Sequence, residues 1–305
     1  MSALVAALDV GGTSVKAAVY EPVPGGLRRV AGLRRPTERG EDPARVLADQ
    51  AGKLIGELAE SAGPLAAAGV VVPGVVDERA GIARFSANLG WRDAPLPALL
   101  AERIDLPVAF GHDVTAGGLA EHRLGAARGF ADVAFVPVGT GIAAALLLDG
   151  RPYRAGGHAG ELGHLDVGHD LTCGCGAVGC LEAIASAAAL ARRYTARSGR
   201  PAEGAREVLT AAGSGDPDAA AVLDDAVAAL GDGLRQLVTL LAPEVVVLGG
   251  GLFGAGDGLA ARVRRRVAER LTFQRMPELR RARLGDEAGC LGAGLLAADL
   301  AGVAP

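Results

Sequence analysis

The sequence predicts an α/β protein with two lobes of related design. Its 305 residues exceed one ordinary domain, about 100 to 200 residues, and suit two. Short apolar runs that are typical of strands alternate with helical patterns, which indicates a layered α/β architecture. A strand–turn–strand pattern over residues 4–20 returns over residues 133–148, and both turns contain Gly and Thr. We therefore expect two lobes that face one another over a shared ligand.

Composition narrows the class of partner. Hydrophobic residues make up 50% of the chain and charged residues 22%, which excludes a largely disordered polymer. The formal net charge is −4, whereas binding to nucleic-acid phosphates needs a clustered excess of positive charge. The arginines at residues 262–270 lie at helical spacing and predict a solvated helix face. We expect a small-molecule partner and no nucleic acid.

Two further features of the sequence favour the cytoplasm. The first residues lack a cationic leader region, and no apolar run reaches the roughly 18 to 20 residues of a membrane-spanning helix. We therefore expect a cytoplasmic protein that does not bind a membrane. Because the cytoplasm is reducing, the 4 cysteines are not expected to form structural disulfides.

The first turn of the chain is a candidate phosphate site. Residues 3–10 form an apolar run that predicts a buried strand, and residues 15–20 predict a second strand. Between them, Gly11, Gly12 and Thr13 can leave backbone N–H groups uncovered, which suits an anionic phosphate. A plain tight turn is the alternative.

Asp113 is the best single candidate for chemistry. Residues 43–61 predict an amphipathic helix, and residues 67–72 and 106–110 predict strands. Asp113 follows the second of these strands, at the expected lobe boundary, and begins another helical pattern. A carboxylate there can take the proton of a hydroxyl that attacks phosphorus. The alternative role is that of a helix N-cap.

The second half of the chain repeats the opening pattern and extends it. Strands are predicted at residues 133–138 and 142–148, on either side of Gly139, Thr140 and Gly141. A helix, a strand, a glycine turn and two more helices follow, at residues 216–241, 244–248, 249–251, 259–271 and 292–300. The glycine turn matches the dinucleotide fingerprint G-x-G-x-x-G only weakly, because the nearby acidic Glu269 falls inside a helical pattern.

The most specific local signal is a set of metal ligands, namely His164, Cys173, Cys175 and Cys180. Thiolate and imidazole suit Zn²⁺, and the intervening glycines let the loop curl around an ion. Because four ligands close a tetrahedron and leave no position for water, we expect a structural zinc. His158 and His169 lie nearby as alternative ligands, whereas Cys290 stands apart and is expected to be a buried apolar residue.

Two carboxylates flank this loop among small residues, Glu161 and Glu182. A carboxylate pair can accept several hydroxyl hydrogen bonds at once, which is what a polyol or a sugar offers. The alternative for Glu182 is an ordinary residue of a first helical turn, where the helix dipole favours an acid. His164 can hold zinc by one ring nitrogen and orient a substrate hydroxyl by the other.

Together these segments resemble the ROK family of bacterial sugar kinases. The resemblance covers nearly the whole chain and rests on seven segments: LDVGGTSVKAAVY at 8–20, SANLGW at 86–91, the segment at Asp113, VGTGI at 138–142, GHAGELGH at 157–164, CGCGAVGCLE at 173–182 and EVVVLGGGL at 244–252. It implies a two-lobed actin-like ATPase (ribonuclease H-like) fold with a structural zinc loop. The small lobe would comprise residues 1–113 with the C-terminal helix 292–305 packed against it, and the large lobe residues 114–291.

The resemblance also implies an ATP-dependent hexose kinase that acts at the 6-hydroxyl with Mg²⁺. Asp113 would be the general base. The nucleotide would lie against Gly11, Gly12, Thr13, Lys16, Gly139, Thr140, Gly141, Gly249, Gly250 and Gly251. The sugar would lie against Asn88, His112, Asp113, Glu161, His164 and Glu182. A homodimer or homotetramer is expected.

The alternatives concern the sugar and the catalytic competence. SANLGW looks like the glucokinase version, whereas a kinase for N-acetylmannosamine or N-acetylglucosamine is the alternative. His112 stands where the family usually has Asn, and Ala143 and Ala144 follow the second turn where glycines are common. These departures also allow a sugar-binding sensor with weakened catalysis. A repressor of this family is not expected, because Asp9 leaves no room for a preceding DNA-binding segment.

Overall fold

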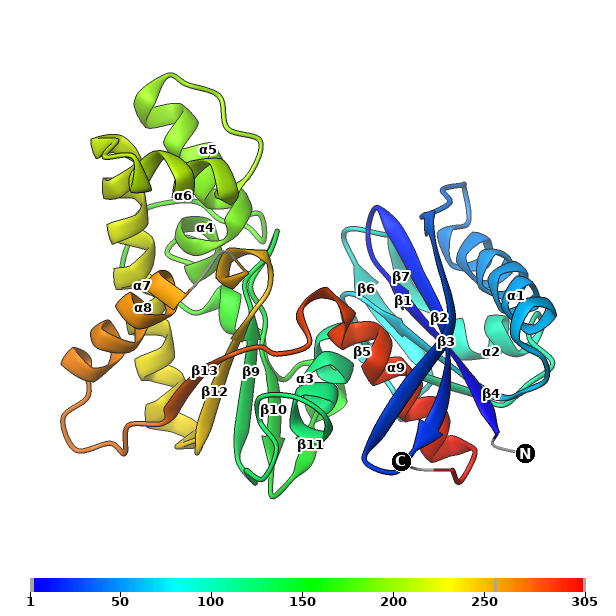
Figure 1. Ribbon diagram of the computed structural model, residues 1–305. Coiled ribbons are helices and arrows are strands. Elements are labelled where there is room, and N and C mark those ends of the chain that lie inside the picture. The colour runs from blue at the N-terminus through cyan, green and yellow to red at the C-terminus, as the bar shows by residue number, and fades with distance from the viewer. Residues whose placement is uncertain (1–2, 255–256, 304–305) are drawn as a thin grey trace. The chain divides into compact units, whose positions relative to one another are not determined.

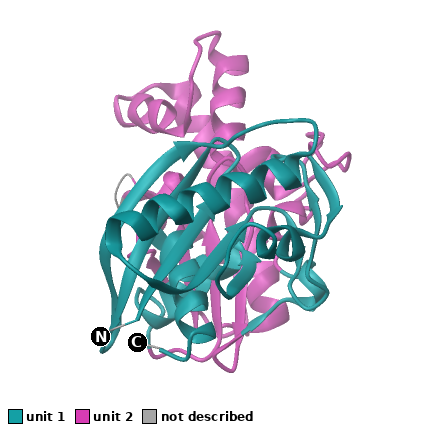
Figure 2. Ribbon diagram, turned by 90° about the vertical axis from the view of Figure 1, so that its right-hand side faces the viewer, with its two compact units in different colours: residues 1–128, 152–159, 287–305 teal, residues 129–151, 160–286 magenta. Residues whose placement is uncertain are grey.

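The computed structural model describes residues 3–254 and 257–303, and the chain forms two compact units (Figure 1 and Figure 2). Unit 1 consists of residues 1–128, 152–159 and 287–305, and unit 2 of residues 129–151 and 160–286. The lobe boundary that the sequence predicts after residue 113 stays a prediction.

Unit 1 contains a five-stranded sheet in the order β3-β2-β1-β4-β8. The first three strands are antiparallel neighbours: β1 (Leu4–Val10), β2 (Ser14–Val23) and β3 (Gly26–Pro36). β4 (Leu65–Val72) pairs parallel with β1, and β8 (Val108–His112) pairs parallel with β4. β1 and β4 are buried at almost every position, as expected of central strands that are covered on both faces.

Helices cover both faces of this sheet. On one face, α1 (Pro43–Ala62) packs Leu47, Leu54 and Leu58 against the sheet, and its N-cap Asp42 accepts a hydrogen bond from the N–H of Arg45. On the other face lie α3 (Asp113–Arg123) and α9 (Ala288–Leu300). The small residues of α9 allow a very close approach, since a Cβ on Gly69 of β4 would lie 2.0 Å from the carbonyl oxygen of Ala293. Cys290 of α9 is buried in this contact, as the sequence predicts.

A second, three-stranded sheet of unit 1 carries the loop of Asn88. It consists of β5 (Val75–Asp77), β6 (Ile82–Ser86) and β7 (Trp91–Ala94), and α2 (Leu96–Ala101) follows it. The strands pair antiparallel, and the buried Leu89 and Trp91 join the same core as α1. This core fixes the base of the loop between β6 and β7.

Unit 2 repeats the opening of unit 1. β9 (Val133–Pro137) and β10 (Ala145–Leu148) are antiparallel, β12 (Val245–Gly249) pairs parallel with β9, and β13 (Glu278–Arg281) pairs parallel with β12. The full sheet order is β11-β10-β9-β12-β13, with β11 at Arg151–Tyr153.

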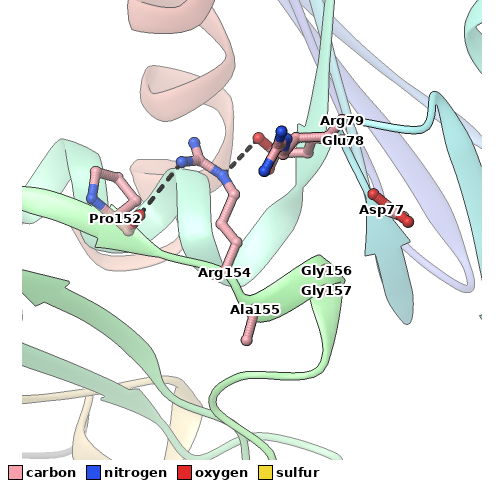
Figure 3. A pocket seen from close by; sticks show the side chains of 8 residues that line it. All are labelled: Asp77, Glu78, Arg79, Pro152, Arg154, Ala155, Gly156 and Gly157. Carbon is pink, nitrogen blue, oxygen red and sulfur yellow. Dashed lines mark hydrogen bonds and ion pairs between the residues drawn. The ribbon is translucent and has the colours of Figure 1, made fainter.

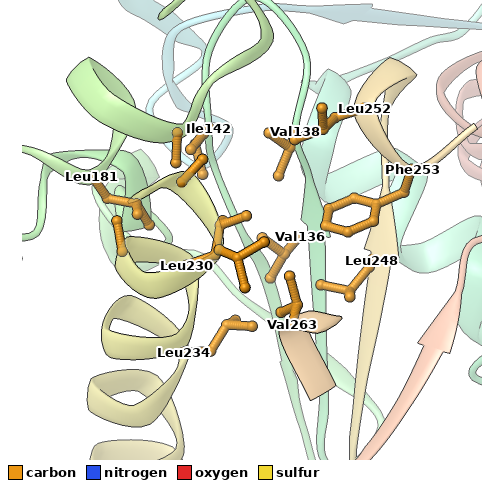
Figure 4. Close-up of a cluster of buried hydrophobic side chains, with 14 of the residues drawn as sticks. Val136, Val138, Ile142, Leu181, Leu230, Leu234, Leu248, Leu252, Phe253 and Val263 are labelled. Atoms are coloured by element: carbon orange, nitrogen blue, oxygen red, sulfur yellow. The ribbon is translucent and has the colours of Figure 1, made fainter. Parts of the chain in front are cut away.

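The helices of unit 2 are α4 (Leu181–Ala185), α5 (Ala187–Ser198), α6 (Ala205–Gly213), α7 (Pro217–Leu241) and α8 (Asp257–Arg270). Short 3-10 turns of unit 2 occur at Leu162–His164 and Gly251–Phe253; another, Ala155–Gly157, lies in unit 1, and Gly285–Glu287 joins the end of unit 2 to the last segment of unit 1. A core of hydrophobic, mainly aliphatic side chains fills the space between the sheet and α4, α7 and α8 (Figure 4). Val136, Ile142, Leu181 and Leu230 lie in this core.

The structure differs from the sequence-based prediction in several places. The strand predicted from residue 142 begins at Ala145, because Ile142 instead forms an isolated bridge with Val138. β3 is an arginine-rich edge strand without the apolar alternation that reveals a strand. The predicted solvated face of α8 agrees with the exposure of Arg264, Arg265 and Arg270, and Arg262 and Arg270 also form surface ion pairs with Asp224 and Asp232 of α7. In the described part of the chain, no helix combines the length and the apolar character that crossing a membrane requires.

Candidate functional site

The β1–β2 connection of unit 1 forms a tight turn at residues 11–13. The N–H of Gly11 donates to the carbonyl oxygen of Ser14 at 2.9 Å, and this bond closes the turn. Within the described residues, no acceptor takes the N–H groups of Gly12 and Thr13. Backbone N–H groups left open in this way can bind an anion.

Two side chains from the loop that follows β3 donate hydrogen bonds to carbonyl oxygens of this turn. The Thr37 hydroxyl donates to the carbonyl oxygen of Gly11 at 2.7 Å. The guanidinium of Arg39 donates to the carbonyl oxygens of Gly12 and of Asn88, the latter at 2.7 Å. Arg39 therefore joins the turn to the loop that carries Asn88. Neither residue was predicted from the sequence, since their loop matches no motif and their partners lie 26 to 49 residues away along the chain.

Asp9 and Lys16 lie at the base of the same turn. They face one another in the β1–β2 pairing, and the Nζ atom of Lys16 is 4.0 Å from a carboxylate oxygen of Asp9. Asp9 is a third residue, after Thr37 and Arg39, that was not among the predicted site residues. A carboxylate next to a phosphate turn is the oxygen ligand that Mg²⁺ prefers.

Asp113 is the first residue of α3, directly after β8. The position that precedes the helix belongs to His112, so Asp113 is not the N-cap. One carboxylate oxygen of Asp113 accepts the N–H of Val114 at 2.7 Å and lies 3.1 Å from Nε2 of His112. The other ring nitrogen of His112 lies 3.2 Å from the hydroxyl of Thr115. These contacts fix the Asp113 side chain through one oxygen and leave the second oxygen for another partner.

In unit 2, the β9–β10 connection forms a turn at residues 139–142. The N–H of Gly139 donates to the carbonyl oxygen of Gly141 at 2.9 Å, and the carbonyl oxygen of Gly139 accepts the N–H of Ala187 at 2.8 Å. The N–H of Ile142 donates to Oε2 of Glu182 at 2.8 Å. Glu182 is thus brought against the turn that the sequence assigns to phosphate, although the sequence predicts a sugar contact for it.

The glycine turn at residues 249–251 packs against the same segment. The N–H of Val138 donates to the carbonyl oxygen of Gly249 at 2.9 Å. Gly250 has a φ of +78°, and a Cβ there would lie 2.4 Å from the carbonyl oxygen of Val138. The two glycine turns of unit 2 therefore meet at Val138, and only glycine fits at residue 250.

The four predicted metal ligands of unit 2 lie together. The ligand atoms of His164, Cys173, Cys175 and Cys180 are all within 4.8 Å of one another. Cys175 Sγ lies 3.7 Å from Cys180 Sγ, and Cys173 Sγ lies 3.8 Å from Nδ1 of His164. A tetrahedral Zn²⁺ with Zn–S bonds of about 2.3 Å would separate two sulfurs by about 3.8 Å. The donor set and its spacing therefore fit zinc.

The thiols of this cluster differ in their surroundings. Burial raises the pKa of the Cys180 thiol to about 12. The backbone N–H of Ala177 lowers the pKa of the Cys175 thiol, which is exposed. A bound dication would offset the cost of ionising the buried thiol.

The other histidines are not members of the cluster found in the described residues. His169 uses both ring nitrogens on backbone groups: Nδ1 accepts the N–H of Leu171 at 3.1 Å, and Nε2 donates to the carbonyl oxygen of Cys180 at 3.0 Å. It therefore supports the loop without a free nitrogen for metal. His158 belongs to the segment of unit 1 at residues 152–159.

Glu161 lies beside this His–Cys cluster, and both Glu161 and His164 are exposed. Its Oε2 atom is 3.8 Å from Nε2 of His164, whose Nδ1 faces the cysteines. The two ring nitrogens of His164 thus face two different groups, a metal site and a carboxylate. This orientation supports the dual role that the sequence suggests for His164.

A separate hollow of unit 1 lies beside β5, with a cavity volume of about 530 Å³. Arg154 and Glu78 both line it and form an ion pair, with 2.5 Å between Nε and Oε2 (Figure 3). Arg154 also donates to the carbonyl oxygen of Pro152, so this guanidinium fastens the segment at residues 152–159 to the β5–β6 turn. None of the predicted site residues lines this hollow.

Comparison with known proteins gives consistent matches over the whole chain. The sequence profile of the ROK family matches residues 5–300. A glucokinase from Halalkalibacterium halodurans is 32% identical over 311 residues, which cover 95% of this chain and 93% of that protein. The structure of a ROK hexokinase from Thermus thermophilus is 38% identical, with a TM-score of 0.83 over 96% of this chain and 97% of that one. The structure of a ROK family glucokinase from Streptomyces griseus in complex with glucose and AMPPNP is 28% identical, with a TM-score of 0.82 over 97% of this chain and 99% of that one.

Proposed function

The chain belongs to the ROK family and has the actin-like ATPase fold of that family, as the sequence predicts, and from this premise we propose that it phosphorylates a hexose. The donor is ATP, the acceptor is the 6-hydroxyl, and glucose is the preferred sugar. The related structure that holds glucose together with AMPPNP supports this choice of substrates. Since ATP is a cytoplasmic substrate, the reaction would take place in the cytoplasm. The predicted homodimer or homotetramer stays a prediction.

The observation that carries the proposal is the fixed carboxylate of Asp113. One of its oxygens is held by the N–H of Val114 and by His112, so the other can accept the proton of the sugar hydroxyl. The hydroxyl oxygen then bonds to the γ-phosphorus, the bond from that phosphorus to the β–γ bridging oxygen breaks, and ADP leaves. Phosphoryl transfer of this kind needs positioning and charge neutralisation more than covalent help.

The remaining groups have roles in binding. The open N–H groups of Gly12 and Thr13 would bind phosphate oxygens in unit 1, as would those of Thr140 and Gly141 in unit 2. Lys16 would add positive charge, and the glycines at residues 249–251 would lie by the adenosine. Mg²⁺, held by Asp9 directly or through water, would neutralise phosphate charge. Sugar hydroxyls would bind Asn88, His112, Glu161, His164 and Glu182, and the metal cluster would hold a structural Zn²⁺.

One departure from the family pattern does not bear on the nucleotide path. The side chain of Ala144 is 4% exposed and belongs to the hydrophobic core of unit 2. Its methyl group therefore packs into that core. This observation favours an active kinase over a sugar-binding sensor with weakened catalysis.

A coupled assay of ADP release tests the proposal, with glucose, mannose, N-acetylglucosamine and N-acetylmannosamine as acceptors. We expect glucose to give the highest kcat/KM. Asp113→Asn should lower kcat at least ~100-fold, which is the usual contribution of a general base, and should keep the thermal stabilisation by glucose. The same substitution at the exposed Asp105 of unit 1 is the control and should leave kcat unchanged.

Two outcomes would contradict the proposal. Thermal stabilisation by a hexose without any ADP release would indicate a sensor. A highest kcat/KM on an N-acetylated sugar would reject glucose as the preferred substrate while leaving sugar phosphorylation intact.

A further inference from the structure

We propose that the Glu182 carboxylate positions the turn at residues 139–142 for the nucleotide and does so before any sugar binds. This inference rests on the proposed function, since it assumes that the turn binds phosphate. It adds a second role to a residue that is otherwise expected to contact sugar alone. Glu182 is then a positioning residue for the nucleotide.

The first support is the contact between the carboxylate and the turn. Oε2 of Glu182 accepts the N–H of Ile142 at 2.8 Å, 40 positions away along the chain. A Cβ on Gly141 would lie 2.5 Å from the same oxygen. The carboxylate therefore packs directly on the turn, and glycine at residue 141 makes room for it.

The second support is that both ends of this hydrogen bond are anchored in one core. Ile142 is 4% exposed, and Leu181, the neighbour of Glu182, is fully buried in the same cluster (Figure 4). The N–H of Leu181 also donates to the carbonyl oxygen of Leu165 at 2.9 Å. Because close packing holds both backbones, the carboxylate meets the Ile142 N–H without further adjustment.

A third support comes from the residues that follow Glu182. The N–H of Ala187 donates to the carbonyl oxygen of Gly139, so the start of α5 holds the other end of the turn. The carbonyl oxygen of Glu182 accepts the N–H of Ser186, and the Ser186 side chain accepts the N–H of Ala189. The segment from Glu182 to Ala187 thus fixes both ends of the turn and leaves the N–H groups of Thr140 and Gly141 between them.

Loss of the carboxylate should therefore weaken nucleotide binding even without sugar. In its absence the N–H of Ile142 loses its acceptor, and the turn has to be ordered when the nucleotide binds. The loss of one such hydrogen bond with a charged partner corresponds to an affinity that is about 10-fold lower or more. A residue that contacts sugar alone would not change this affinity.

Isothermal titration with Mg²⁺ and AMP-PNP, in the absence of sugar, tests the inference. We expect Glu182→Ala to raise the Kd about 10-fold or more. Glu182→Gln should stay within about 3-fold of wild type, because its amide oxygen can still accept the Ile142 N–H. Glu161→Ala is the matched control: it removes the other candidate sugar carboxylate, which lies 3.8 Å from Nε2 of His164, and should leave the Kd for the nucleotide unchanged.

Several outcomes would overturn the inference: a wild-type Kd in Glu182→Ala, an equal loss in Glu182→Gln, or a wild-type protein that binds no nucleotide without sugar. Should Glu182→Ala fail to fold, Glu182→Asp replaces it, because aspartate keeps the charge and is too short to reach the turn. The proposed function is tested separately by ADP release from the wild-type protein with glucose. If the wild-type protein phosphorylates glucose but Glu182→Ala binds the nucleotide with the wild-type Kd, this inference alone is rejected. If Glu182→Ala loses nucleotide affinity but the wild-type protein releases no ADP with glucose, the proposed function alone is rejected.

Discussion

The two strand–turn–strand units share a design but are held by opposite kinds of side chain. In unit 1, the Thr37 hydroxyl and the Arg39 guanidinium donate to carbonyl groups of the turn at residues 11–13. In unit 2, the Glu182 carboxylate accepts an N–H group of the turn at residues 139–142. The first turn therefore has a positive charge beside it and the second a negative charge.

This difference separates charge from geometry in phosphate binding. A guanidinium attracts phosphate and also holds the backbone, so its loss removes both effects. A carboxylate repels phosphate, so it can help binding only through the shape that it gives to the turn. The turn of unit 2 should therefore depend on the packing of its surroundings more than the turn of unit 1 does.

Removal of the proposed zinc should have the largest effect and should be confined mainly to unit 2. Cys180 directly precedes α4, which carries Glu182. A loosened His–Cys cluster should therefore also free Glu182, whose carboxylate holds the turn at residues 139–142. Because structural zinc contributes folding free energy directly, we expect a chelator to lower the Tm by about 10 °C or more. Hydrogen exchange should rise at residues 139–142 and 165–182 before it rises at residues 4–20.

Elemental analysis should first find one zinc per chain in gently purified protein. Cys290→Ala, which changes a buried cysteine outside the cluster, should retain that zinc. A folded protein with full activity and no bound metal would contradict this account.

The local arrangement of the motifs was predictable from the sequence, whereas the side-chain contacts that hold the two turns were not. The cluster of His164, Cys173, Cys175 and Cys180 lies within one short loop, so spacing and ligand type suffice to predict it. The place of Asp113 directly after a strand was predictable because a strand and a helical pattern meet there, whereas its catalytic role stays a proposal.

The hydrogen bonds of Arg39 and Glu182 join residues 27 to 49 positions apart, and only the packed cores bring them together. Their residue types carry no signal of such partners, since exposed arginines and first-turn glutamates are common in any helix or loop. For the same reason, the edge strand β3 escaped prediction, because its arginines need no apolar face.

Gly250→Ala should give the next largest effect, again in unit 2. The added methyl group would meet the Val138 carbonyl in a backbone conformation that side chains rarely adopt. We expect a loss of about 2 kcal/mol or more in the free energy of unfolding, measured by urea denaturation, and a raised KM for ATP. Gly251→Ala is the control, since a Cβ there meets nothing within 4 Å, and an equally large loss in this control would show that the close approach at Gly250 is not the cause.

Arg39→Ala tests the turn of unit 1 and should have a smaller effect on stability than on nucleotide binding. Arg39 is exposed, so its loss costs little packing, but it removes a positive charge and two hydrogen bonds. We expect the KM for ATP to rise about 10-fold and the Tm to change little.

Arg39→Lys should recover only part of this loss, because an ammonium group cannot bridge two carbonyls as a planar guanidinium does. Arg35→Ala, which removes an exposed ion pair with Glu57, should leave the KM unchanged. Equal effects of Arg39→Ala and Arg35→Ala would refute a specific role for Arg39.

The smallest effect is expected at the opposite end of the strands that lead to the turns of unit 2. Ala131 and Asp132 directly precede β9, and Glu244 directly precedes β12. The backbone N–H groups of Ala131 and Asp132 donate to the Glu244 carboxylate and lower the pKa of this carboxyl group. Because the folded pKa lies below the unfolded one, the stabilisation is complete above the unfolded value of about 4.3 and is lost as the pH falls through the folded pKa.

Glu244→Gln should therefore be less stable than wild type at pH 7, and this difference should shrink below about pH 4. Urea denaturation at both pH values measures it, with Glu60→Gln, a change at an exposed carboxylate of α1, as the control that should show no such convergence. β9 and β12 pair in parallel from the residues next to Glu244 to Gly249. If the difference in stability between Glu244→Gln and wild type does not change with pH, the ionised carboxylate does not help to hold these strands in register, and the core alone does.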